Sequence, residues 1–330
     1  MGRYVARRLL QFIPTFLVVT LIAFILLQLA PGDPITLQLD DANASAVARD
    51  SLEAWRKLKG LDRPLVSQYL HWVWSFVRFD FGRSLVDERS VRDVMAEALP
   101  RTLLLTMLSL FFTYALSIPL GIHSAVRKGS RNDRIISGTL FVLYSMPAFW
   151  VALILVVLLG GGEFLHLFPI RGLQSEGMEK AGIAARGIDL AWHLVLPVTC
   201  MTYPSLARTS RFQRTAMLDV IRQDYIRTAR AKGLTERAVI LRHALKNSLL
   251  PILTLLSVDL PGVIGGSVII ERIFTIRGMG MLTFEAILRR DYPVIMGVVA
   301  LVAALTMIGV LLGDLAYAWA DPRIRFGRQR

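Results

Sequence analysis

The sequence has few of the features on which soluble enzymes and secreted modules depend. It contains one cysteine, Cys200, in 330 residues, so disulfide frameworks, Cys-x-x-Cys metal sites and thiol redox chemistry have no support. No glycine is followed by lysine, and the phosphate-binding loop of ATP-hydrolysing proteins therefore has no counterpart. Gly-x-Ser-x-Gly and His-Glu-x-x-His are absent too, and the five histidines lie in separate segments. We therefore predict no catalytic residue, no metal ligand and no cofactor bound by this chain.

Charge is also scarce, at 19% of residues against 54% apolar residues, and the mean hydropathy is +0.51. The charges fall between long apolar runs, a pattern typical of a membrane protein rather than of a soluble domain, and a span needs about 20 mostly apolar residues. The first run, about 22 residues long, is too long for a signal-peptide core. The fourth run is the weakest, because it contains Pro197 and Pro204. We predict an all-α integral membrane protein with six spans, at residues 9–30, 102–126, 135–160, 188–207, 249–270 and 294–319.

Acidic residues are outnumbered, 25 against 38 Lys and Arg, which gives a net charge of +13. Residues 208–248 hold ten basic and three acidic residues, whereas residues 31–101 hold ten and eleven. Basic residues concentrate in cytoplasmic loops, so both termini and residues 208–248 are predicted to be cytoplasmic. The charge excess then sets the orientation, and we expect no nucleic-acid partner.

Residues 31–101 are predicted to form a small helical cap on the external side, between spans one and two. Prolines at positions 31 and 34 end the first helix, and Asp62 is a good N-cap for a helix that starts near Pro64. That helix carries an apolar face at helical spacing, formed by Leu65, Tyr69, Trp72, Phe76 and Phe79. The face either packs on the membrane domain or docks an external partner, and the sequence leaves both interpretations open.

The cytoplasmic segment 208–248, within a core domain of residues 102–330, is the most informative part of the chain. A basic helix ends at Gly233, and a second helix restarts with Thr235 as its cap. Two short helices that meet at a glycine make a protruding knob. Taken alone, the basic helix could equally lie on anionic lipid headgroups.

The residues of this segment resemble the cytoplasmic coupling loop of ABC-importer permeases, most closely those of the dipeptide, oligopeptide and nickel branch. Arg227-Thr-Ala229 stands where the general motif has Glu-Ala-Ala, and Gly233 follows at the family's spacing. The similarity extends over nearly the whole chain through short motifs in the same order, at residues 7–10, 29–34, 61–64, 80–84, 100–102, 225–234, 242–251, 265–274, 278–280, 290–293 and 321–325.

The resemblance implies a type I ABC-importer permease fold in a bacterial inner membrane. It implies assembly with a homologous second permease subunit, two ATPase subunits that use ATP and Mg²⁺, and an external solute-binding protein. The residues implied to contact the ATPase are Arg227, Thr228, Ala229, Arg230, Ala231, Lys232, Gly233, Leu234 and Thr235.

Two acidic residues lie inside predicted spans, where each costs roughly 2.5–3.5 kcal/mol at mid-bilayer on insertion scales. Asp314 is interpreted as structural. Asp259 is a candidate for the translocation path together with Gly265 and Gly266, because glycines in a span allow close approach of other groups. Pairing within the bundle is the alternative for Asp259.

We predict a transport subunit without catalytic activity, which forms half of a pathway for peptides. Nickel or glutathione permeases share the same motifs and stay open as alternatives. A self-contained secondary transporter would show paired repeats and coupling-ion residues, and neither is evident. A membrane-anchored binding module would need only one span.

Overall fold

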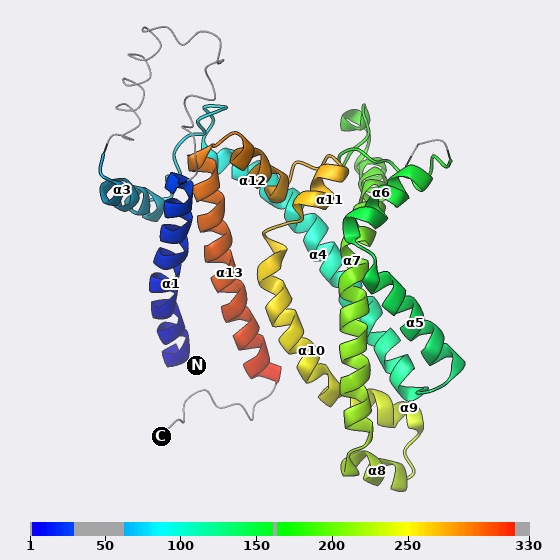
Figure 1. The fold of residues 1–330 in the computed structure, drawn as a ribbon. Helices are drawn as coiled ribbons and strands as arrows, with labels where there is room; N and C mark the ends of the chain where they lie inside the picture. Colours follow the sequence, from blue (N-terminus) through cyan, green and yellow to red (C-terminus); the bar gives the residue numbers. More distant parts are fainter. Residues whose placement is uncertain (1, 30–62, 161–163, 321–330) are drawn as a thin grey trace.

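The computed structural model describes residues 2–29, 63–160 and 164–320, and these residues fold almost entirely into helices (Figure 1). Five helices are long and apolar enough to cross a membrane, and the count rises to six when the bent pair α5–α6 is taken as one span. The prediction of an all-α membrane protein is confirmed. The helices are α1 (Gly2–Leu29), α3 (Leu65–Val77), α4 (Val91–Val126), α5 (Arg131–Ser145), α6 (Ala148–Leu159), α7 (Ile183–Ile221), α8 (Asp224–Ala231), α9 (Glu236–Ala238), α10 (Leu245–Asp259), α11 (Val268–Ile273), α12 (Met279–Leu288) and α13 (Tyr292–Ala320).

Helices α4 and α7 cross in the centre of the molecule and make its most extensive helix–helix contact. Around them lies the largest buried apolar cluster, with Leu105 from α4, Cys200 from α7 and Phe274 after α11. Serines and threonines line the same interface: the Thr202 hydroxyl donates to the Ser109 carbonyl at 3.4 Å. Small polar residues of this kind allow spans to approach closely and bond to each other.

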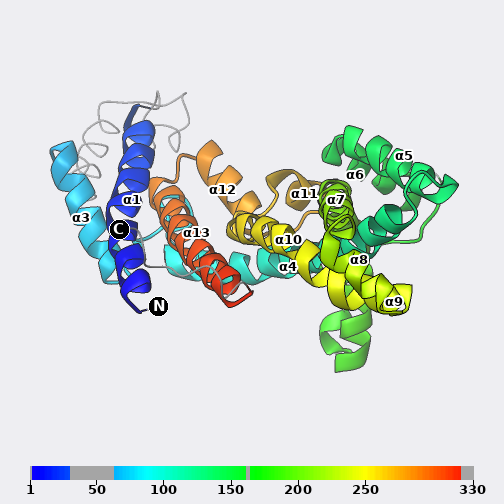
Figure 2. The same cartoon turned by 90° about the horizontal axis from the view of Figure 1, so that it is seen from below.

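Seen from below, the helices form an elongated row from α3 and α1 at one end to α5 and α6 at the other, rather than a closed bundle (Figure 2). Within α1, only 6% of the most apolar window is buried. A row of spans presents much of its surface to lipid or to another subunit, and this leaves room for a partner along its length.

The cap helix α3 packs across α1 through aromatic side chains. The Tyr69 hydroxyl donates to the Leu17 carbonyl at 2.8 Å and lies 3.0 Å from the Thr20 hydroxyl. Phe76 stacks near Phe16, with ring centroids 4.8 Å apart. The predicted face therefore packs on the membrane domain at Tyr69, Trp72 and Phe76, while Leu65 and Phe79 are exposed. Asp62 lies outside the described residues.

Residues 91–101, predicted as the end of the cap, form the first turns of the 36-residue helix α4. The segment just before α4 is tied to the start of α13. Asp291 accepts hydrogen bonds from the Ser84 hydroxyl and, at 3.1 Å, from the Leu85 amide.

The third predicted span is broken. Helix α5 ends at Ser145, α6 begins at Ala148, and the two axes differ by 97°. Met146 has φ −88° and ψ 126°, because the residue before a proline is driven out of the helical region. The Tyr203 hydroxyl of α7 donates to the Met146 carbonyl at 2.8 Å and satisfies a backbone group that the break leaves without a helical partner.

The fourth and fifth spans also differ from prediction. The fourth, predicted to be weak, belongs to the 39-residue helix α7, which continues through Pro197 and Pro204. Pro197 is buried against neighbouring helices and Pro204 is half-buried. The fifth ends as an α-helix at Asp259, with a 3₁₀ turn at Leu260–Val263, well before the predicted residue 270. Gly265 and Gly266 therefore lie beyond the helix rather than inside it.

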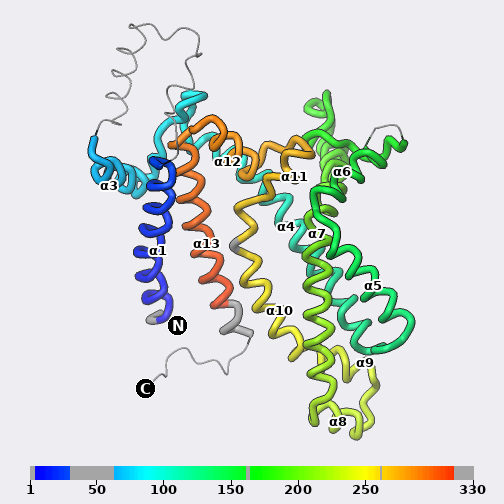
Figure 3. The backbone as a smooth tube through the Cα atoms, in the orientation of Figure 1, coloured from blue at the N-terminus to red at the C-terminus, as the bar shows by residue number. Residues whose placement is uncertain are grey.

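The first residues of α1 and the last residues of α13 lie at the same end of the molecule as α8 and α9 (Figures 1 and 3). Helices α11 and α12 lie at the opposite end, beside the start of α4. This arrangement of the described helices agrees with six spans when α5 and α6 are taken as one.

Candidate functional site

The predicted contact segment forms a compact knob at one end of the molecule. Helix α8 ends in a Schellman motif: the Gly233 amide donates to the Arg230 carbonyl at 2.9 Å and the Leu234 amide to the Ala229 carbonyl at 3.4 Å. Gly233 has φ +76°, a left-handed conformation in which side chains other than glycine are strained. The glycine predicted to end the helix is therefore required by the backbone.

The turn is closed by side chains on both sides. Thr235 caps α9 by accepting a hydrogen bond from the Ala238 amide at 3.4 Å, as predicted. Arg230 makes two bonds to Glu236 across the turn, at 2.6 and 3.1 Å. The Asn247 amide donates to the Tyr225 hydroxyl at 2.7 Å and ties α8 to the start of α10.

The underside of the knob is packed onto the ends of the spans. Ile226 and Ala229 of α8 are buried in a cluster with Met217, Val239 and Ala244. Among the nine predicted contact residues, only Ala229 is buried, and residues 227–228 and 230–235 are exposed. The structure thus brings these residues together as one exposed surface with an apolar base.

Both ends of the knob continue directly into spans. Helix α7 leads into α8 after two residues. Helix α9 continues through a π-helical stretch, Val239–Ala244, into α10 without an interruption. A displacement of the knob would therefore act on α7 and α10 together.

Asp259, at the end of α10, is paired within the spans. The Arg208 guanidinium of α7 lies 2.7 Å from its Oδ1, and the Tyr114 hydroxyl of α4 donates to its Oδ2 at 2.9 Å. We call these three residues the intramembrane polar cluster. The pairing predicted as the alternative for Asp259 is present. Sequence reasoning missed Arg208 and Tyr114, although Arg208 is the first charge after the apolar run of the fourth span.

The other two residues proposed for the translocation path lie elsewhere. Gly266 has φ +64°, and a side chain there would meet the Glu271 carboxylate and Thr102, since an added Cβ would lie 2.3 Å and 2.9 Å from them. Glu271 is 1% exposed and accepts bonds from the Thr102 hydroxyl at 2.9 Å and the Met281 amide at 2.8 Å. Gly266 is therefore a packing requirement at the joint between α4, α11 and α12.

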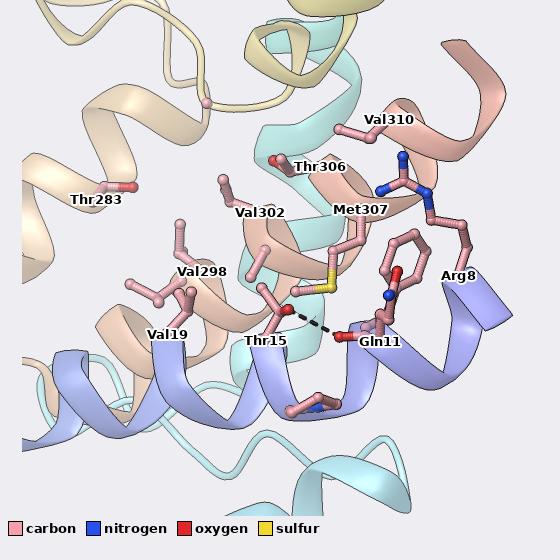
Figure 4. Close-up of a pocket in the computed structure, with 15 residues that line it drawn as sticks. Arg8, Gln11, Thr15, Val19, Thr283, Val298, Val302, Thr306, Met307 and Val310 are labelled. Carbon is pink, nitrogen blue, oxygen red and sulfur yellow. Dashed lines mark hydrogen bonds between the residues drawn. The ribbon is translucent and has the colours of Figure 1, made fainter. Parts of the chain in front are cut away.

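Gly265 lines a cavity of about 940 Å³ that lies between α1 and α13. Thr283 of α12 lines the same cavity. Arg8 and Gln11 lie near one end of this cavity and Thr283 near the other, with Val298, Val302 and Met307 between them (Figure 4). Arg8, at this end, forms an ion pair with Asp314 at 2.8 Å, and Asp314 also accepts a hydrogen bond from the Tyr4 hydroxyl at 2.8 Å. Asp314 thus joins α1 to α13, in agreement with its predicted structural role. Asp259 does not line the cavity.

A row of apolar spans with a short basic knob between two of them defines a helical, multi-span membrane subunit. The chain belongs to the family described as "Binding-protein-dependent transport system inner membrane component", which matches residues 117–326. The corresponding N-terminal family model matches residues 1–106. It is a multi-pass inner-membrane permease subunit of an ABC importer, without enzymatic activity of its own.

Relatives in this family cover the chain from end to end. It is 39% identical to the oligopeptide transport system permease protein AppB of Bacillus subtilis, over 99% of this chain and 100% of that protein. It is 35% identical to the dipeptide transport system permease protein DppB of Escherichia coli, over 98% and 99%. A structure described as inward-facing MetNI methionine ABC transporter matches 69% of this chain and 96% of its own chain, with a TM-score of 0.52 and 18% identity. That likeness supports the type I permease fold.

Proposed function

We propose that this chain forms half of a translocation pathway for peptides in an ATP-driven importer. The similar proteins AppB and DppB are named for oligopeptide and dipeptide transport, which supports peptides over the nickel and glutathione alternatives. The other half comes from a homologous second permease subunit, and an external solute-binding protein delivers the substrate. Two ATPase subunits use ATP and Mg²⁺, for which this chain has no phosphate-binding loop.

The exposed knob of residues 227–235 is the proposed contact with an ATPase subunit. One observation supports it most directly: the knob is rigidly built, exposed at its tip, and continuous with α7 and α10. The same geometry supports a cytoplasmic position for both termini, since α1 begins and α13 ends at the knob's end of the molecule.

A cross-linking experiment tests this contact. Leu234 is exposed and Cys200 is buried, so Leu234→Cys in a Cys200→Ala chain gives one accessible thiol. We expect a short bifunctional reagent to join position 234 to an ATPase subunit in the assembled complex. Lys128→Cys is the matched control, because residue 128 is exposed in the neighbouring turn between α4 and α5. Equal cross-linking from both positions, or none from position 234, would contradict the proposal.

An uptake experiment tests the substrate. The assembled complex in vesicles, with its binding protein outside and ATP inside, is expected to accumulate labelled tripeptide and to need ATP for it. Labelled glutathione and Ni²⁺ are the comparison substrates. Preferential uptake of either one, or uptake by this chain alone, would overturn the assignment.

A further inference from the structure

The intramembrane polar cluster holds opposite charges side by side between helices that are long and apolar enough to span a membrane. Arg214 of α7 pairs with Asp133 at the first turn of α5 at 2.9 Å, close to the knob's end of the bundle. Arg208 lies six residues farther along α7 toward the other end, or about 9 Å at the helical rise. Charged groups within spans face protein or a water-filled path and are commonly functional.

The cluster is open on one side and has bonding capacity left. The side chains of Arg208 and Asp259 are 39% and 17% exposed. A guanidinium has five N–H donors, and the described residues give Arg208 a bond from Nη2 to Asp259, while its buried Nε has no partner among them. Each carboxylate oxygen can accept more than one bond. Both members of the pair can therefore bind a further charged group without first being separated.

The cluster also bridges α7 and α10, the two helices that continue from the knob. Helices α7 and α10 diverge from the knob and are joined near it by a buried bond from Gln213 to Ser248, at 3.1 Å. Farther along, Arg208 and Asp259 join the same two helices. A ligand that binds either charge would therefore contact one of the two helices that are continuous with α8 and α9.

We propose that Arg208 and Asp259 bind the charged termini of peptides in transit, one terminus at a time, because the two groups are 2.7 Å apart whereas the ends of an extended tripeptide are about 10 Å apart. This inference rests on the proposed function and assigns residues to the substrate. A free peptide is a zwitterion at neutral pH, since its α-carboxyl group is ionised and its α-amino group protonated. Arg208 binds the carboxylate through its unused N–H donors, a geometry for which guanidinium is well suited. Asp259 accepts hydrogen bonds from the ammonium group, and Tyr114 holds the carboxylate of Asp259 in place.

The test compares peptides that differ only at their termini. Uptake by the complete complex in vesicles is measured for a free tripeptide, its C-terminal amide and its N-acetyl form. Arg208→Gln is expected to lower the ratio of free-peptide to amide uptake about tenfold, the effect of one charge-assisted hydrogen bond. Asp259→Asn is expected to lower the ratio of free-peptide to N-acetyl uptake by a similar factor. Because the binding protein is the same throughout, its own preference cancels when variant ratios are compared with the wild-type ratios.

Two further variants separate recognition from structure. Arg208→Lys keeps the positive charge and is expected to retain most of the wild-type preference for the free carboxylate. Arg214→Gln breaks a different ion pair on α7 and is expected to leave both ratios unchanged. If Arg208→Gln lowered the uptake of all three peptides equally, in a complex of normal subunit composition, this inference would be overturned. The proposed function would be unaffected. Failure of the wild-type complex to take up any peptide would overturn the proposed function and this inference with it.

Discussion

Arg230 and Glu236 lie face to face across the Gly233 turn, with Nη2 of the arginine 2.6 Å from Oε1 of the glutamate and Nε 3.1 Å from Oε2. An exposed ion pair contributes only about 0.2–1 kcal/mol to the free energy of unfolding. The main effect of these two parallel bonds is therefore to fix the relative angle of α8 and α9. The shape of the knob therefore depends on the left-handed backbone of Gly233 and on the buried base formed by Ile226 and Ala229.

Gly233→Ala is expected to reduce ATP-driven uptake several-fold while the complex still assembles. An L-residue in the left-handed region costs about 1–2 kcal/mol, which favours other conformations of the turn. Nothing lies within 4 Å of an added Cβ, so the effect is one of backbone conformation and not of collision. Gly129→Ala is the matched control, since Gly129 has φ +80°, equal open space and a place in the other turn at this end. Equal losses of uptake in the two variants would show that the knob has no special part in coupling.

Tyr203→Phe is expected to loosen the bend between α5 and α6. The substitution keeps the ring and removes the hydroxyl that donates to the Met146 carbonyl at 2.8 Å. A buried carbonyl left without a partner costs about 1–3 kcal/mol. Hydrogen exchange of the assembled complex should become faster in residues 143–150. Tyr144→Phe, at an exposed position on the same bend, is the control, and unchanged exchange in the Tyr203 variant would refute the role of this bond.

Glu271→Gln is expected to change how stability depends on pH. Burial raises the pKa of Glu271, while hydrogen bonds from Met281 and Thr102 oppose the rise. Because the folded pKa is raised, ionisation of Glu271 lowers stability as pH rises from about 4.5 through the folded value. Glutamine stays neutral, so the melting temperature of the variant minus that of the wild type should increase over this window.

This difference is measured by thermal unfolding of the purified complex at several pH values. Glu285→Gln provides the matched control, at an exposed position of α12. A constant difference between the Glu271 variant and the wild type across the whole pH range would contradict the prediction.

Asp314→Asn is expected to loosen α1 from α13. Asp314 accepts a hydrogen bond from Tyr4 and forms an ion pair with Arg8, and α1 has little other buried surface. We expect a loss on the order of 1 kcal/mol for each weakened bond, since hydrogen bonds to charged groups are worth somewhat more than neutral ones. Faster hydrogen exchange in residues 4–12 would report it. Asp219→Asn is the control, because Asp219 is exposed on α7, and it should leave the exchange of residues 4–12 unchanged. Unchanged exchange of these residues in Asp314→Asn would contradict the prediction.

Local signals determined the features of this chain that were predicted correctly. Long apolar runs indicated the spans, and a glycine followed by a threonine cap indicated the turn at Gly233, because both depend on neighbours in the sequence. The boundaries at Ser145, at Asp259 and at the start of α4 were not predicted. Pro147 separates α5 from α6 whereas α7 continues through Pro197 and Pro204, so a proline alone does not determine whether a span is broken.

By itself, the sequence determined that this chain is a multi-span helical membrane protein with a basic knob, together with its likeness to importer permeases. Only the tertiary structure decided which charges meet. Arg208 and Asp259 are separated by 51 positions, and Tyr114 lies on a third helix. Gly266, predicted beside Asp259 on the path, packs closely against Glu271 and Thr102. Apolar periodicity determines which residues enter the membrane, but pairing between spans depends on how long helices cross, and no short stretch of sequence records that angle.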